Sequence, residues 1–351
     1  MSRFGLVSEQ PEAKRLLDAA LAEGPAHAYL FHGPHGVGKR QLARAFAHEL
    51  LGTAREFHPD LYELDALGEM IRIDAVRELR RDLHMRPFEA DRRVYLVFSA
   101  HLMNEDAADA LLKDLEEPPP YAVIVLVADD LGAIPETIRS RCQLVPFRRL
   151  SERAIRDVID ARAPELEEER RVAYARMAAG RLDRAERLLD PKAAVRRETL
   201  LAQARGVYLE TSFDAGDAAS ALVACTRERA GEARALEEVK VEGLELPARE
   251  AEQRVRRAQR GAEREELLAQ LEELAAWYRD LVVVAVGAER AVVHADRIED
   301  LRADGTRERL LGAERAAAAV RDTWRKLEEF NLTPQLALEA LFVRIGWELR
   351  A

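Results

Sequence analysis

The chain has 351 residues, too many for one compact hydrophobic core, which predicts two or three domains. With 48% hydrophobic and 34% charged residues, the composition predicts a soluble globular protein and excludes a disordered one. The formal net charge of -10 excludes a uniformly basic nucleic-acid binder, so any DNA contact must come from a local patch or from a larger assembly.

The sequence also indicates the cellular compartment of the protein. It holds no apolar stretch long enough to span a bilayer, and its first residues lack the apolar core of a signal peptide. Its two cysteines, Cys142 and Cys225, are too few for a disulfide framework or a four-cysteine zinc site. We therefore expect a cytoplasmic protein without membrane contact.

The chain begins with an amphipathic helix that Ser8 is predicted to cap and that runs to Ala22. A short apolar strand over 28–31 follows and leads into the loop GPHGVGKR at 33–40. This loop meets the pattern G-x-x-x-x-G-K-[ST] except at its last position. A helix over 41–51 comes next, so the order is strand, glycine-rich loop, helix.

The residues of this loop predict a phosphate cradle. Gly33, Gly36 and Gly38 let backbone N–H groups turn inward around a phosphate, and Lys39 can reach the outer phosphates. The last position should be a hydroxyl that ligates magnesium. Arg40 stands there instead and would repel a cation, so the cradle lacks its metal ligand.

Strand and helix patterns alternate from the loop to about residue 150. Apolar runs predict strands at 58–64, 94–98, 123–127 and 143–147. Helical patterns cover 73–83, 105–117 (with Asn104 as its cap) and a short turn of helix within 134–142. This alternation favours a mostly parallel sheet and an α/β nucleotide-binding domain over 1–150.

The helix predicted over 73–83 carries three arginines on or near its outer face: Arg77, Arg80 and Arg81. A solvated helix face is the plainer interpretation, and a patch that follows nucleic-acid phosphates is the sharper one.

Strand signals fade after residue 151. Several short helices are predicted over 151–205 and long helices over 206–351, including one over 263–286. The segment 236–250 is predicted to be a bent helix and loop. The fold class is therefore α/β followed by all-α, in three domains: 1–150, 151–205 and 206–351.

Hydrolysis of ATP beside such a loop also needs an Asp, often with a Glu, at the end of an apolar strand. The strand over 94–97 ends instead in Phe98 and Ser99, and His101 comes too late, where a surface or capping role is the plainer interpretation. With Arg40 this makes two independent losses, so we expect no ATP hydrolysis by this chain. No cofactor is required; ATP or ADP can still bind through Lys39 without being hydrolysed, or the loop holds none.

Three segments carry specific motifs: residues 27–33, the stretch around ALLKDLEEPP within 103–119, and TIRSRC at 137–142. Together they resemble the AAA+ clamp-loader subunits of bacterial replication. Residues 331–339 also resemble the end of that family's collar. The resemblance implies an AAA+ P-loop domain, a small helical lid domain and a helical collar domain for oligomerisation in the three ranges given above.

The family includes motor subunits with intact ATP sites and a delta-prime type whose site is degenerate, and the losses found here match the latter. The resemblance implies a place in the DNA polymerase III clamp loader beside motor (gamma/tau) and delta subunits. The resemblance implies only indirect contact with the sliding clamp. Contact with primed DNA would occur within the assembled complex, either indirectly or through Arg77, Arg80 and Arg81.

The resemblance places the family's arginine finger, carried by the SRC motif, at Arg141. It would reach across a subunit boundary to stabilise charge on the γ-phosphate of a neighbour's ATP; a structural ion pair is the other interpretation. Cys142 is not a candidate nucleophile, since no histidine partner is placed for it.

Two departures from the family stand out. Residues 51–57 run straight across the place where many relatives carry four zinc-binding cysteines, so no zinc is expected. The lid arginine position of motor subunits is occupied by Asp183, and Arg184 is a poor substitute.

The function expected is thus a non-hydrolysing stator that donates an arginine finger during clamp loading. The alternatives are a motor-type ATPase and a non-replicative AAA+ adaptor.

Overall fold

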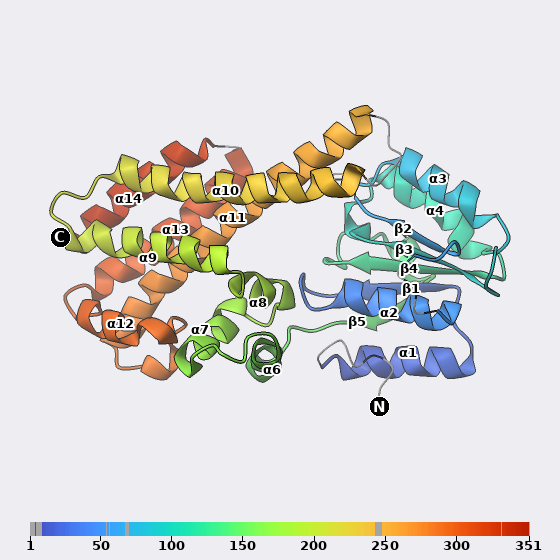
Figure 1. Ribbon diagram of the computed structural model, residues 1–351, viewed down its shortest axis with the longest axis horizontal. Helices are drawn as coiled ribbons and strands as arrows, with labels where there is room; N and C mark the ends of the chain where they lie inside the picture. Colours follow the sequence, from blue (N-terminus) through green and yellow to red (C-terminus); the bar gives the residue numbers. More distant parts are fainter. Residues whose placement is uncertain are drawn as a thin grey trace. The chain divides into compact units, whose positions relative to one another are not determined.

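The computed structural model describes residues 4, 9–53, 55, 57–66, 70–242, 248–330 and 332–350, without the side chains of residues 240, 249, 250 and 328 (Figure 1). Contacts divide the chain into two compact units. The first comprises Met1–Val158 and Ala179–Arg184, and the second Ile159–Ala178 and Ala185–Ala351. The division into three domains at 150 and 205 stays a prediction.

The first unit is built on a parallel sheet, as the alternating pattern predicts. Its strands are β1 (Ala28–His32), β2 (Leu61–Leu64), β3 (Arg93–Val97), β4 (Ala122–Ala128) and β5 (Gln143–Pro146). They lie in the order β2-β3-β4-β1-β5, and every pairing is parallel. The carboxyl ends of the strands therefore share one edge, where the loops after β1, β3 and β4 meet.

Helices cover both faces of this sheet. They are α1 (Pro11–Glu23), α2 (Lys39–Leu51), α3 (Ile73–Leu83), α4 (Glu105–Glu116) and the short α5 (Glu136–Arg139). Tyr29 and Phe31 of β1 are buried on one face with Phe46 of α2, whereas Leu30 is buried on the other with Leu111 of α4. Burial on both faces explains why the strands are continuous apolar runs.

Two helix ends in this unit follow from single residues. Asn104 caps α4, since its side chain accepts a hydrogen bond of 3.1 Å from the N–H of Ala107, as predicted. Gly52 ends α2 in a left-handed conformation with φ +63°. Ser8, the predicted cap of the first helix, lies outside the described residues.

The second unit is helical. Its helices are α7 (Glu168–Ala178), α9 (Pro191–Leu209), α10 (Ala215–Glu242), α11 (Ala248–Ala285), α12 (Ile298–Asp304), α13 (Leu310–Phe330) and α14 (Pro334–Arg350). Two further helices, α6 (Glu152–Arg162) and α8 (Leu182–Leu188), cross the unit borders. None of the helices in the described ranges is long and apolar enough to cross a membrane.

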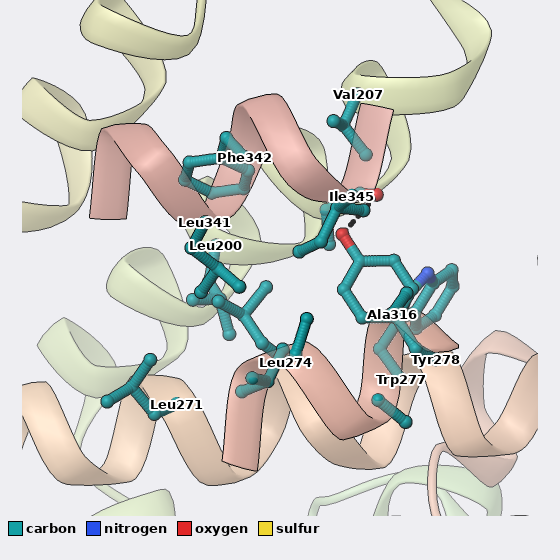
Figure 2. Close-up of a cluster of buried hydrophobic side chains, with 14 of the residues drawn as sticks. Leu200, Val207, Leu271, Leu274, Trp277, Tyr278, Ala316, Leu341, Phe342 and Ile345 are labelled. Carbon is teal, nitrogen blue, oxygen red and sulfur yellow. Dashed lines mark hydrogen bonds between the residues drawn. The ribbon is translucent and has the colours of Figure 1, made fainter. Parts of the chain in front are cut away.

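Side chains from α9, α11, α13 and α14 meet in the core of this unit, among them Leu274, Trp277 and Phe342 (Figure 2). The hydroxyl of Tyr278 donates a hydrogen bond of 3.1 Å to the carbonyl of Ala204, which satisfies a polar group inside the core. The helix predicted from 263 begins at Ala248 and has 38 residues. Of the predicted bent segment over 236–250, residues 243–247 lie outside the described residues.

Candidate functional site

The glycine-rich loop lies between β1 and α2 and requires its glycines. Gly33, Gly36 and Gly38 have φ values of +140°, +73° and +94°, which L side chains rarely adopt. A Cβ at Gly33 would clash with the carbonyl of Phe147, and one at Gly36 with the carboxylate of Asp183. Both the backbone shape and the close approach of neighbouring groups therefore depend on glycine.

Lys39, the predicted phosphate ligand, is 4% exposed and faces its own loop. Its Nζ donates to the carbonyls of Gly33 (2.6 Å) and Pro34 (2.5 Å) and lies 2.7 Å from Oδ1 of Asp129. Burial lowers the pKa of Lys39, and the bond to Asp129 offsets part of this effect. An ammonium group has three protons, so each has an acceptor within the chain.

Asp129, the first residue after β4, was missed by sequence reasoning. Its Oδ2 lies 2.7 Å from Nδ1 of His35, and its backbone N–H donates to Nδ1 of His101 at 3.1 Å. Burial alone would raise the pKa of Asp129, but His35 and Lys39 hold it well below its usual range. The signal available was its position, directly after seven buried strand residues.

Asp183 reaches the loop from the segment Ala179–Arg184 of the same unit. Its carboxylate accepts a bond of 2.7 Å from Arg181 and lies 3.5 Å from Nε2 of His35. The N–H of Leu182 donates to the carbonyl of Gly36 at 2.6 Å. His35 thus bridges two carboxylates, and its pKa is raised, mainly by the hydrogen bond with Asp129.

Arg40 occupies the position of the expected metal ligand. Its guanidinium forms two bonds with Asp65, of 2.5 and 3.0 Å, and donates to Oγ of Ser99 at 2.9 Å. The same group lies 4.7 Å from the centroid of the Phe98 ring. Arg40, which replaces the metal-binding hydroxyl, therefore contacts Phe98 and Ser99, which replace the two carboxylates.

Within the described ranges, no cluster of three or more histidine, cysteine or acidic side chains is arranged to hold a metal ion.

Arg141, the predicted arginine finger, follows α5 and its side chain is 34% exposed. One guanidinium nitrogen donates to the carbonyl of Thr137 at 2.9 Å, and another forms an ion pair with Glu116 at the end of α4. The partners of Arg141 are Thr137, Ser140 and Glu116, and none of these belongs to the side-chain cluster of the glycine-rich loop.

The three arginines of α3 are brought to one open cavity of about 540 Å³. The cavity is lined by Asp74, Arg77, Arg80, Arg81 and His84. Arg80 forms an ion pair with the buried Asp114, whose other oxygen lies 3.0 Å from Nε2 of His84. Asp114 thus fixes Arg80, while Arg77 has a 3.5 Å pair with Asp74 on the exposed side.

Cys142 should react slowly with thiol reagents, because burial raises its pKa to about 12 and only the thiolate is nucleophilic. At pH 8 we expect alkylation roughly 10³-fold slower than that of an ordinary exposed thiol. Peptide mass spectrometry after iodoacetamide treatment, which distinguishes Cys142 from Cys225, measures it, with the protein unfolded in denaturant as the control. Rapid labelling of Cys142 in the folded protein would contradict this raised pKa.

Residues 9–151 match the family model described as DNA polymerase III, delta subunit. The tau subunit of DNA polymerase III from Bacillus subtilis is 31% identical over 206 residues, which cover 53% of this chain and 36% of that one. The delta' subunits of B. subtilis and Pseudomonas aeruginosa are 32% and 38% identical, over 42% and 33% of this chain and 50% and 42% of theirs.

The chain thus spans about a third to a half of the length of these relatives. Among solved structures, a gamma subunit-related protein of Thermotoga maritima aligns over 97% of this chain and 100% of its own, with 18% identity and a TM-score of 0.48.

The parallel sheet with its glycine-rich loop, followed by the helical second unit, gives the α/β and then all-α fold class that the sequence predicts. Over residues 9–151 the chain is similar to the family described as DNA polymerase III, delta subunit.

Proposed function

We propose that this chain is a delta-prime type of clamp-loader subunit, a stator that does not hydrolyse ATP and that donates an arginine finger to a neighbouring ATPase subunit. In this role it helps to load the sliding clamp on primed DNA in the cytoplasm. The observation that carries the proposal is that the charged groups of the glycine-rich loop are paired with one another, Lys39 with Asp129 and Arg40 with Asp65.

These internal pairs oppose the binding of a nucleotide phosphate at Lys39 and of magnesium beside Arg40. A phosphate would have to replace Asp129 on Lys39 while the carboxylate of Asp183 stays close to Gly36, and like charges at such distances repel strongly. A divalent cation beside Ser99 would meet the guanidinium of Arg40. Phe98 offers no carboxylate to hold the cation or to orient water.

The contacts of Arg141 suit a group that changes partners. Its ion pair with Glu116 is half exposed, and such pairs contribute little to stability. The γ-phosphate of a neighbour's ATP would compete well for the same guanidinium, because Arg binds phosphate oxygens in a bidentate manner.

The outer face of α14 supports assembly with other subunits. Leu336, Val343 and Trp347 are 65%, 40% and 75% exposed and follow the spacing of a coiled-coil seam. An exposed tryptophan in an apolar stripe is typical of a protein interface. We propose that residues 206–351 form the collar that meets motor (gamma/tau) and delta subunits through such surfaces.

For DNA, we propose that Arg77, Arg80 and Arg81 contact phosphates of primed DNA in the assembled complex. The support is the cavity that they share and the fixed position of Arg80.

The purified chain should show no ATP turnover above background with magnesium and primed DNA, because it lacks both carboxylates of a hydrolytic site. Phosphate release measures this, with a motor subunit as the positive control.

Lys39→Ala in the reconstituted loader should leave the ATPase rate of the loader unchanged, because the hydrolysed ATP sits in another subunit. Turnover by the isolated chain that Lys39→Ala abolishes would instead establish the motor-type ATPase.

A further inference from the structure

Helices α10 and α11 pack against each other as a helical hairpin (Figure 1). The last buried residue of α10 is Ala230 and the first of α11 is Ala262 among the residues described. With a rise of 1.5 Å per residue, the remainder of the hairpin is about 17 Å long. Packing of the hydrophobic core does not explain this extension.

Four arginines of α11 share one face of the extension: Arg256, Arg257, Arg260 and Arg264. At 3.6 residues per turn they fall within a sector of about 100°. Arg256, Arg260 and Arg264 are exposed and Arg257 is half-buried. Arg254 lies outside the sector and forms an ion pair with Glu237 of α10, which ties the two helices together.

The net charge of the segment that holds these arginines is opposite in sign to that of the whole chain. Residues 251–264 contain five arginines and two glutamates, a net charge of +3 in a protein of -10. The partners of Arg256 and Arg257 are weak competitors: Arg256 and Glu252 form a 2.6 Å pair with side chains 67% and 61% exposed, and Arg257 has a 3.4 Å bond to Gln253. A phosphate can displace both, because it accepts bidentate bonds from a guanidinium.

We propose that this arginine face of α11 binds the phosphate backbone of nucleic acid. The sector holds no apolar side chain from Gln253 to Arg264, whereas a protein interface needs an apolar or aromatic centre and a membrane-binding helix needs an apolar face. Interfaces with nucleic acid are polar and positively charged. The inference rests on the proposed function for its choice of primed DNA as the probe, but the contact requires no ATP.

The test compares the full-length chain with the triple variant Arg256→Ala, Arg257→Ala, Arg260→Ala. Fluorescence anisotropy with labelled primed DNA, between about 50 and 200 mM KCl, gives the dependence of affinity on salt. Three lost phosphate contacts should reduce the slope of log K against log[salt] by about 2 to 3 and weaken binding at low salt at least about tenfold. Alanine favours helix, so circular dichroism should show the fold retained.

The matched control removes three exposed arginines elsewhere in the same unit, Arg302→Ala, Arg325→Ala and Arg344→Ala, and should keep the wild-type slope. An equal slope in the two triple variants overturns the proposal, as does a wild-type chain that fails to bind at 50 mM KCl. Loss of subunit assembly with unchanged DNA binding would also overturn it and point to an acidic protein partner. The DNA-free ATPase of the reconstituted loader reports separately on the proposed function.

Discussion

Replacing Arg141 with alanine should reduce ATP hydrolysis at the neighbouring site of the reconstituted clamp loader by about 10³-fold or more. An arginine finger neutralises charge that develops on the γ-phosphate in the transition state, and alanine supplies none. The half-exposed guanidinium and its replaceable partner Glu116 leave Arg141 able to reach such a phosphate. Single-turnover hydrolysis by the loader with primed DNA measures the effect.

The controls separate catalysis from assembly. Arg148→Ala removes a side chain that is 84% exposed on the same unit and should leave the rate unchanged. Glu116→Gln breaks the ion pair of Arg141 but keeps the arginine, so it should not lower the rate. Gel filtration should show that all three variants join the complex. A normal rate with Arg141→Ala would show that Arg141 makes a structural ion pair only.

Replacing Asp280 with alanine should lower the free energy of unfolding of the second unit by about 3–5 kcal/mol. Asp280 is fully buried and accepts hydrogen bonds from the backbone N–H groups of Val293 (2.9 Å) and His294 (2.8 Å). Its carboxylate also lies 2.9 Å from Nδ1 of His294. Alanine would leave these buried groups unpaired. Urea denaturation followed by circular dichroism measures the loss. The control is Asp322→Ala in α13, whose ion-pair partners Arg325 and Lys326 are more than half exposed, so its effect should be small.

The same contact gives the second unit a pH dependence. Burial alone would lower the pKa of His294, but Asp280 and Glu273 outweigh it and raise the pKa above its ordinary value of 6.5. The stabilisation is therefore complete below about pH 6.5 and is lost as the pH rises through the higher folded-state pKa. His294→Asn should remove this part of the pH dependence, and an identical profile in the variant would contradict the pairing.

The sequence predicted most elements because their signals are local. Apolar runs locate β3 and β4, and Asn104 and Gly52 locate two helix ends. The start of α11 was missed because residues 251–261 bury nothing and so show no apolar period. In that stretch the helix is stabilised by ion pairs, Arg254 with Glu237 of α10 and Arg256 with Glu252 of α11, and not by core packing.

The candidate site was only partly predictable. Spacing alone selected Lys39, Arg40 and the missing carboxylates at Phe98 and Ser99. Their partners Asp129 and Asp65 lie far away in sequence and come close only because of the strand order β2-β3-β4-β1-β5. The order of strands in the sheet cannot be derived from local sequence patterns. The ion pairs of Lys39 with Asp129 and of Arg40 with Asp65 could therefore be found only in the structure.

Clamp loading by the reconstituted complex, with and without this chain, tests the central claim most directly. Motor and delta subunits, sliding clamp, primed DNA and ATP are mixed, and clamp retained on DNA is measured. The chain should join the complex, and loading should fail without it, return when it is added, and remain when it carries Lys39→Ala. Full loading in its absence, or failure of the chain to assemble with the other subunits, would contradict the stator role.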